Sequence, residues 1–169
     1  FDLYNNKGQQ INKKIERGTS IPKGEYHLAV HIWFRNSEGK YLMQKRNKQT
    51  DRIPGQFAAT GGAVASGEDS ITGAIREVEE ETGLKEIELG KFISITLHEY
   101  FDPYLKEEVI KESHWYHMKV KGEPSLIPQA EEDITQIKCV DSMDLADYLK
   151  NTYSTIKEVI KLFSSSQLP

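Results

Sequence analysis

The segment 70–82 places the strongest constraint on the fold, because its apolar side chains recur at helical spacing. They form a single stripe along one side of a helix: Ile71, Ala74, Ile75, Val78 and Thr82. Such a stripe is stable only when a sheet or a second helix covers it. Gly83 follows directly and is typical of a residue that ends a helix, since glycine readily adopts a left-handed conformation. We therefore predict a helix over 70–82 that packs on another layer.

Runs rich in β-branched and aromatic residues stand on both sides of this helix and are typical of strands. The runs expected to form strands are 27–35, 41–45, 57–60, 92–100, 113–120 and 136–140. A small hairpin is expected within 3–15, and two further helices are expected at 142–149 and 155–163. Strands before and after a central helix predict an α+β fold, an α/β/α sandwich with a mixed sheet, rather than a βαβ repeat.

The length and composition indicate one globular domain over residues 1–169. Within it, residues 1–25 are expected to form an N-terminal hairpin and loop, and residues 142–169 the C-terminal helices and a tail. Hydrophobic residues account for 37% and charged residues for 28%, a balance that excludes a disordered chain.

Charge and cysteine content limit the expected partners and compartment. The net charge of −4 argues against nucleic acid binding, which needs clustered Lys and Arg. No apolar run approaches the roughly 20 residues that span a bilayer, so no membrane association is expected. Cys139 is the single cysteine and the first residues show no secretory pattern, which favours a cytoplasmic protein with this thiol in its core. A homodimer is compatible with the sequence.

Three carboxylates stand beside the apolar stripe of the expected helix. Glu77, Glu80 and Glu81 fall within about one turn, where like charges repel by a few tenths of a kcal/mol per pair. Arg76 is the only cation from residue 68 to residue 82. Uncompensated carboxylates are typical of a site for a hard divalent cation. On composition alone, a solvated acidic face is the commoner explanation.

The spacing of the whole segment 62–84 favours the metal site, because it resembles the Nudix box, G-x5-E-x7-R-E-U-x-E-E-x-G-U, with U a bulky aliphatic residue. The chain fills every fixed and aliphatic place of that pattern, with Gly62, Glu68, Arg76, Glu77, Val78, Glu80, Glu81, Gly83 and Leu84. The resemblance implies a loop–helix–loop that holds divalent metal, Mg²⁺ with Mn²⁺ as a substitute.

Specific roles follow from the resemblance. It implies that Glu80 and Glu81 are the main metal ligands and that the backbone carbonyl of Gly61 is a further ligand. Glu77 matches a third carboxylate, which is a ligand or the base that activates water. Arg76 belongs to the same catalytic group.

The resemblance also implies structural roles and an activity. Glu68 is expected to pair with Arg76, whose guanidinium can fork onto a carboxylate. Gly62 and Gly83 are expected to have backbone roles. The implied reaction is hydrolysis of a phosphoanhydride bond in a nucleoside diphosphate derivative or another small diphosphate compound, by bound metal and an activated water.

The flanks resemble the branch of this superfamily that includes isopentenyl diphosphate isomerase. The similar runs are 24–28, 42–46 and 54–57. Gly61 stands where the isomerase has its catalytic cysteine, and Ala63 stands at a nearby histidine position. We therefore expect hydrolysis, with an isomerase-like enzyme and a non-catalytic nucleotide-sensing Nudix protein as alternatives.

Four residues outside the box are candidates for substrate or auxiliary roles. His27 lies on a strand, where a structural histidine is the commoner case. Lys45 and Arg46 end a strand and are placed to meet substrate phosphates, but solvated charges fit equally well. Glu112 is a candidate for an extra base or ligand, against a default of surface charge.

Overall fold

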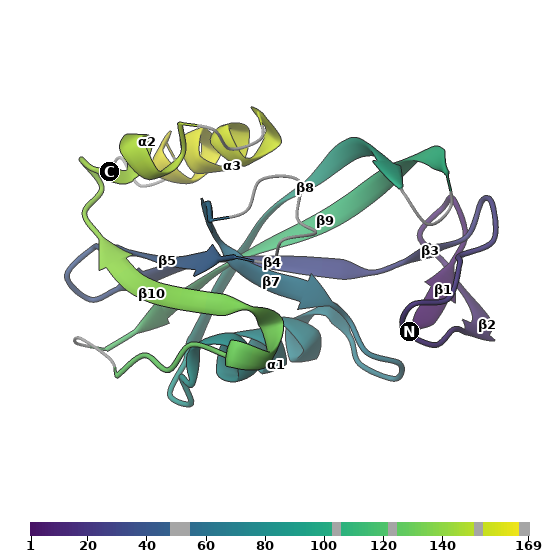
Figure 1. Cartoon of the computed structure of the whole chain (residues 1–169), viewed down its shortest axis with the longest axis horizontal. Coiled ribbons are helices and arrows are strands. Elements are labelled where there is room, and N and C mark those ends of the chain that lie inside the picture. Colours follow the sequence, from purple (N-terminus) through teal and green to yellow (C-terminus); the bar gives the residue numbers. More distant parts are fainter. Residues whose placement is uncertain (48–54, 103–105, 122–124, 151–153, 166–169) are drawn as a thin grey trace.

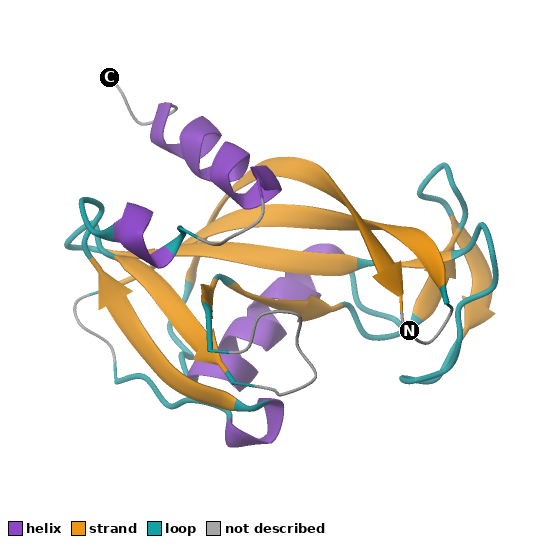
Figure 2. Ribbon diagram, turned by 45° about the horizontal axis from the view of Figure 1, so that its top comes forward, coloured by secondary structure: helices purple, strands orange, loops and turns teal. Residues whose placement is uncertain are grey.

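Across the described residues, one mixed sheet of seven strands separates two layers of helices (Figure 1). Helix α1 (Ser70–Thr82) lies on one face, and α2 (Leu145–Tyr148) and α3 (Ser154–Ser165) lie on the other, as Figure 2 also shows. The arrangement confirms the predicted α/β/α sandwich. The computed structural model describes residues 1–47, 55–102, 106–121, 125–150 and 154–165.

The large sheet brings the start of the box beside α1. Its strands are β4 (Ala29–Asn36), β5 (Tyr41–Arg46), β6 (Phe57–Ala58), β7 (Thr60–Ala63), β8 (Glu88–Asp102), β9 (Glu107–Val120) and β10 (Ile134–Val140). Their order is β10-β5-β4-β9-β8, with β6 paired to β5 and β7 paired to β4. β4 and β9 are parallel, whereas β7 is antiparallel to β4. β7 therefore runs beside the central strand β4 and leads directly into the loop before α1.

Both ends of α1 are capped by residues that the sequence supplies. Asp69 accepts a hydrogen bond from the backbone N–H of Thr72 through its Oδ1, at 2.7 Å. Gly83 adopts φ 75°, and its N–H donates to the carbonyl of Glu79 at 2.9 Å. A glycine in the left-handed conformation directs its N–H toward a carbonyl of the last helical turn, which would otherwise lack a hydrogen-bond donor. The predicted bounds of this helix are confirmed.

Alternation along β4 divides the core between the two faces of the sheet. Ile32 faces α1 and packs in a cluster with Val78, and both side chains are fully buried. Trp33 points the other way and packs with Val159 of α3. Ile71 was expected in the buried stripe of the helix, but it lies in the first turn of α1 and is 40% exposed.

Several expected bounds are wrong. Strands β8 and β9 are longer than 92–100 and 113–120, because their backbone ladder continues from Leu97 opposite Glu112 to Asp102 opposite Glu107. The run 57–60 is divided into the short strands β6 and β7.

The C-terminal part also differs from expectation. The helix expected at 142–149 is only α2, because a turn from Asp141 to Asp144 precedes it. Cys139, expected in the core, is half-buried on β10. The end of the expected tail, 166–169, lies outside the described residues. Within the described residues no helix is long and apolar enough to cross a membrane.

The described N-terminal residues form a second, three-stranded sheet at one end of the molecule (Figure 1). It contains β1 (Asp2–Tyr4), β2 (Gln10–Lys14) and β3 (Tyr26–His27), with β1 in the middle. β1 and β2 are the arms of the expected hairpin. Only Leu28 separates β3 from β4, so the small sheet is joined directly to the large one.

Candidate active site

Arg76 is the centre of a network that ties the loop before α1 to the helix. Its Nε donates to Glu68 Oε1 at 2.9 Å, and its Nη2 donates to the carbonyl of Ala63 at 3.0 Å. Its Nη1 donates to Glu77 Oε1 and Glu80 Oε2, each at 2.9 Å. The expected pair of Arg76 and Glu68 is therefore present, and the same guanidinium also orients two carboxylates of the helix.

Glu81 points toward the sheet and is buried, with 5% of its surface exposed. Its Oε2 accepts hydrogen bonds from the backbone N–H of Gly61 at 3.0 Å and from the Gln44 amide at 3.1 Å. Thr60 donates to the amide oxygen of Gln44 at 3.2 Å, which fixes the orientation of that amide. Burial outweighs these donors and raises the pKa of Glu81 to about 7.

Glu77 packs against Gly62, the first residue of the box, and Gly61 beside it packs against β4. A side chain on Gly62 would overlap the carboxylate of Glu77, and a side chain on Gly61 would overlap the carbonyl oxygen of Val30. Burial raises the pKa of Glu77 above its usual value, although the charge of Arg76 opposes that shift. Neighbouring atoms therefore lie too close to Gly61 and Gly62 for any larger residue at either position.

The carboxylates offer oxygen donors of the kind that a hard divalent cation prefers. Glu77 and Glu80 share one nitrogen of Arg76, so their oxygens lie within about two hydrogen-bond lengths of each other. Glu81 faces Gly61 instead, and among the described residues no group of three His, Cys, Asp or Glu is arranged to hold a metal. The chemistry of the donors fits Mg²⁺ or Mn²⁺, and the individual ligand assignments stay predictions.

One basic and one acidic residue extend this cluster. Arg46 Nη2 lies 3.0 Å from Glu132 Oε2, which joins the end of β5 to the short 3₁₀ turn Ala130–Glu132. The charge of Arg46 opposes the rise in the pKa of Glu81, and the charge of Glu132 adds to the rise in the pKa of Glu77.

The other candidates lie elsewhere. Lys45 is on the opposite face of the sheet, with its ammonium 5.9 Å from the ring of Phe57. His27 is in the small sheet, where its ring lies 5.0 Å from that of Phe1. Glu112 pairs with His114 on β9 at 2.8 Å. Sequence reasoning missed Gln44, because a neutral amide within a strand run gives no sign of the carboxylate it contacts.

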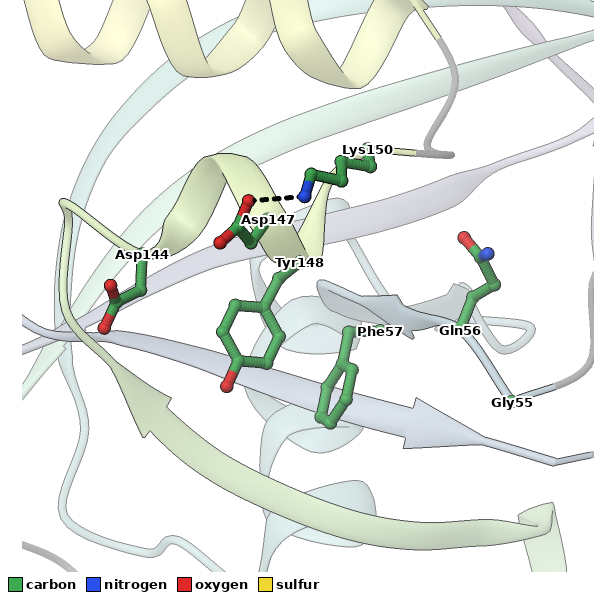
Figure 3. A pocket seen from close by; sticks show the side chains of 7 residues that line it. All are labelled: Gly55, Gln56, Phe57, Asp144, Asp147, Tyr148 and Lys150. Atoms are coloured by element: carbon green, nitrogen blue, oxygen red, sulfur yellow. Dashed lines mark ion pairs between the residues drawn. The ribbon is translucent and has the colours of Figure 1, made fainter.

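A pocket of about 450 Å³ lies across the sheet from α1, between β6 and α2 (Figure 3). Its lining residues are Gly55, Gln56, Phe57, Asp144, Asp147, Tyr148 and Lys150. Phe57 and Tyr148 meet edge to face with their rings 5.0 Å apart, and Asp147 pairs with Lys150 at 2.8 Å. None of the box carboxylates lines this pocket.

Comparison with known proteins identifies the family. The NUDIX domain model matches residues 25–163, most of the chain. The chain belongs to the Nudix family. An uncharacterized Nudix hydrolase of Listeria monocytogenes, lmo0368, is 34% identical over 107 residues, 62% of this chain and 63% of that protein. Nudix hydrolase 3 of Arabidopsis thaliana is 36% identical over 87 residues, 50% of this chain but 11% of the plant protein. The chain thus spans less than two thirds of either relative.

Solved structures share the Nudix fold at low identity. A MutT protein from Methanosarcina mazei superposes with a TM-score of 0.65 at 16% identity, covering 85% of this chain and 96% of that one. An Ap4A hydrolase from C. elegans gives the same TM-score and identity, covering 83% and 97%. DR0079 from Deinococcus radiodurans gives a TM-score of 0.62 at 19% identity, covering 96% and 98%.

Proposed function

We propose that this Nudix protein is a metal-dependent hydrolase that cleaves a phosphoanhydride bond in a nucleoside diphosphate derivative or another small diphosphate compound. The observation that carries the proposal is the folded box, in which one arginine orients Glu77 and Glu80 while Glu81 is buried against Gly61. The relatives are named Nudix hydrolases, and such enzymes generally use divalent metals.

Glu77, Glu80 and Glu81, with the carbonyl oxygen of Gly61, would hold Mg²⁺ or Mn²⁺. When bound, such an ion neutralises phosphate oxygens and makes water more acidic. Glu77, which Arg76 orients, would serve either as one of these ligands or as the group that accepts a proton from the attacking water. Arg46 supplies positive charge beside the same carboxylates and is placed to attract substrate phosphates.

The arrangement favours hydrolysis over isomerisation. An isomerase moves a proton at a carbon atom, and the branch that the flanks resemble uses a thiol for part of that work. Gly61 has no side chain at the matching position, and Cys139 is on β10, opposite Leu42 of β5. The groups beside Gly61 are carboxylate and amide, which suit attack of water on phosphorus.

A hydrolysis screen with Mg²⁺ tests the proposal, in which added phosphatase and pyrophosphatase convert the released monoesters and pyrophosphate to inorganic phosphate for detection. The panel comprises nucleoside triphosphates, dinucleoside polyphosphates, nucleotide sugars, coenzyme A and dinucleotide cofactors, and the positive reaction is repeated in oxygen-18 water. We expect a monophosphate product, oxygen-18 on a phosphate product, and no activity in excess chelator. In parallel, isopentenyl diphosphate should give no dimethylallyl isomer. Formation of that isomer, or full activity in chelator, would overturn the proposal.

A further inference from the structure

The small N-terminal sheet is docked on the box through a buried carboxylate. Asp2 on β1 is 6% exposed. Its Oδ1 accepts a hydrogen bond from the hydroxyl of Ser66 at 2.7 Å, and its Oδ2 accepts one from the backbone N–H of Gly67 at 2.8 Å. These bonds lower the pKa of Asp2, so it is charged at neutral pH. Figures 1 and 2 show this loop, between β7 and α1, reaching the small sheet.

The same loop carries the residue that orients Arg76. The N–H of Ala65 donates to Glu68 Oε2 at 2.9 Å, and the N–H of Glu68 donates back to the carbonyl of Ala65 at 3.1 Å. Gly67, with φ 86°, makes the reversal between them. Asp2 therefore fixes the turn from its N-terminal sheet. Glu68, at the end of that turn, accepts hydrogen bonds from the guanidinium of Arg76.

Asp2 is itself held from both sides. β1 is the middle strand of the small sheet, with β2 on one side and β3 on the other. The neighbouring side chain, Leu3, is 2% exposed and pairs with His27. Both Asp2 and Leu3 lie before the residues 25–163 that match the NUDIX domain.

We propose that Asp2 is a positioning residue for the box: it fixes the loop 65–69 so that Glu68 orients Arg76, and Arg76 in turn orients Glu77 and Glu80. The inference rests on the proposed function, because it assigns these carboxylates a metal to hold. An ionised acceptor that bonds both a hydroxyl and a backbone N–H restricts a loop more than a neutral contact does.

Two measurements on the full chain test the role of Asp2. Hydrogen exchange reports the loop amides, including that of Gly67, without any metal. Mn²⁺ titration followed by electron paramagnetic resonance reports the dissociation constant without any substrate. For Asp2→Ala we expect exchange of the Gly67 amide to rise about tenfold or more, since a charge-assisted bond is lost. We expect the Mn²⁺ dissociation constant to rise about fivefold, because the carboxylates are less ordered.

Three further variants calibrate this result. Asp2→Asn keeps an acceptor oxygen and should fall between wild type and Asp2→Ala in both measurements. Ser66→Ala removes one bond from the loop side and should change both in the same direction, which keeps the test available if Asp2→Ala does not fold. Lys13→Gln breaks the pair between Lys13 and Glu25 in the same small sheet and should leave both unchanged.

Failure of this inference and failure of the proposed function give different results. If wild type binds Mn²⁺ and Asp2→Ala binds it equally well, Asp2 has only a structural role and the inference is overturned, whatever happens to exchange or melting temperature. If wild type itself binds no Mn²⁺, the proposed function fails and the inference fails with it. Weakened Mn²⁺ binding in Asp2→Ala, with Lys13→Gln at the wild-type value, supports the inference.

Discussion

Arg76 carries one positive charge but contacts three carboxylates, so its loss acts on several groups at once. Arg76→Ala should reduce the free energy of unfolding by about 1–3 kcal/mol, because Glu68 and Glu77 lose a charged partner while partly buried. Turnover should fall about tenfold or more, since the helix carboxylates are no longer oriented. Urea unfolding and phosphate release measure the two effects.

Arg76→Lys is the matched control for the geometry of that network. Lysine keeps the charge but cannot bond Glu68, Glu80 and the carbonyl of Ala63 at once, so we expect it to restore part of the stability and less of the turnover. Wild-type stability and turnover in Arg76→Ala would show that the network has no energetic importance.

The helix carboxylates should separate catalysis from folding. Glu80→Gln and Glu81→Gln should each lower turnover by about a hundredfold or more, on the scale of losing a group that stabilises charge in the transition state. The fold should persist, because removing one of several like charges relieves repulsion. Circular dichroism and steady-state kinetics test this. Glu79→Gln is the control, since Glu79 is exposed on the same helix and loses the same charge. Near-normal turnover in Glu80→Gln or Glu81→Gln would contradict the ligand assignment.

The raised pKa of Glu81 gives the metal-free protein a specific dependence on pH. The folded value is about 7, against an ordinary value of 4.5. Because the folded state holds this proton more tightly than the unfolded state, wild type should lose stability as pH rises from 4.5 through about 7. Glu81→Gln has no ionisable carboxyl at this position, so it should not lose stability in this pH range. In chelator, the melting temperature of Glu81→Gln relative to wild type should therefore increase from pH 5 to pH 8. A difference that is constant with pH would contradict a raised pKa for the buried carboxyl of Glu81.

At the level of elements, α1 was predictable because both ends carry local signals. Asp69 caps its start and Gly83 its end, and neither cap depends on distant residues. Asp69→Ala should lower the melting temperature by about 3 °C, because the N–H of Thr72 loses its acceptor. Differential scanning calorimetry measures the change, and turnover should fall far less than in Glu80→Gln. An unchanged melting temperature would show that the first turn is stable without its cap.

The strands were less predictable, because tertiary pairing sets their length. Residues 107–112 are mostly charged and have only two β-branched residues, Val109 and Ile110, yet they continue the ladder with β8. Ala59 interrupts β6 and β7, where pairing changes from β5 to β4. Such a change depends on two partner strands that are distant in sequence, and no local pattern encodes it.

At the candidate site, the sequence predicted the residues that belong to the box motif, but it did not predict the residues that the sheet contributes. The pairing of Glu68 with Arg76 was implied by the resemblance to the Nudix box. The contact of Gln44 with Glu81 was not, since it joins residues of β5 and α1 that only the folded sheet brings together. Arg46 and Lys45 were equal candidates by sequence. The alternation of β5 places Arg46 with Glu132 on the side of the carboxylates and Lys45 on the other face.

For the whole molecule, a bound ion should add stability that depends on the box. A ligand that binds only the folded state stabilises it by about 2.7 kcal/mol at one hundred times its dissociation constant. For a chain of this size that corresponds to a rise in melting temperature of about 5–10 °C. We expect Mg²⁺ to produce such a rise in wild type and excess chelator to reverse it. The rise should be largely absent in Glu80→Gln and Glu81→Gln and present in Glu79→Gln, whose side chain lies away from the network. An equal rise in all four proteins would show that the ion binds elsewhere, and no rise in any of them would contradict a metal site at the box.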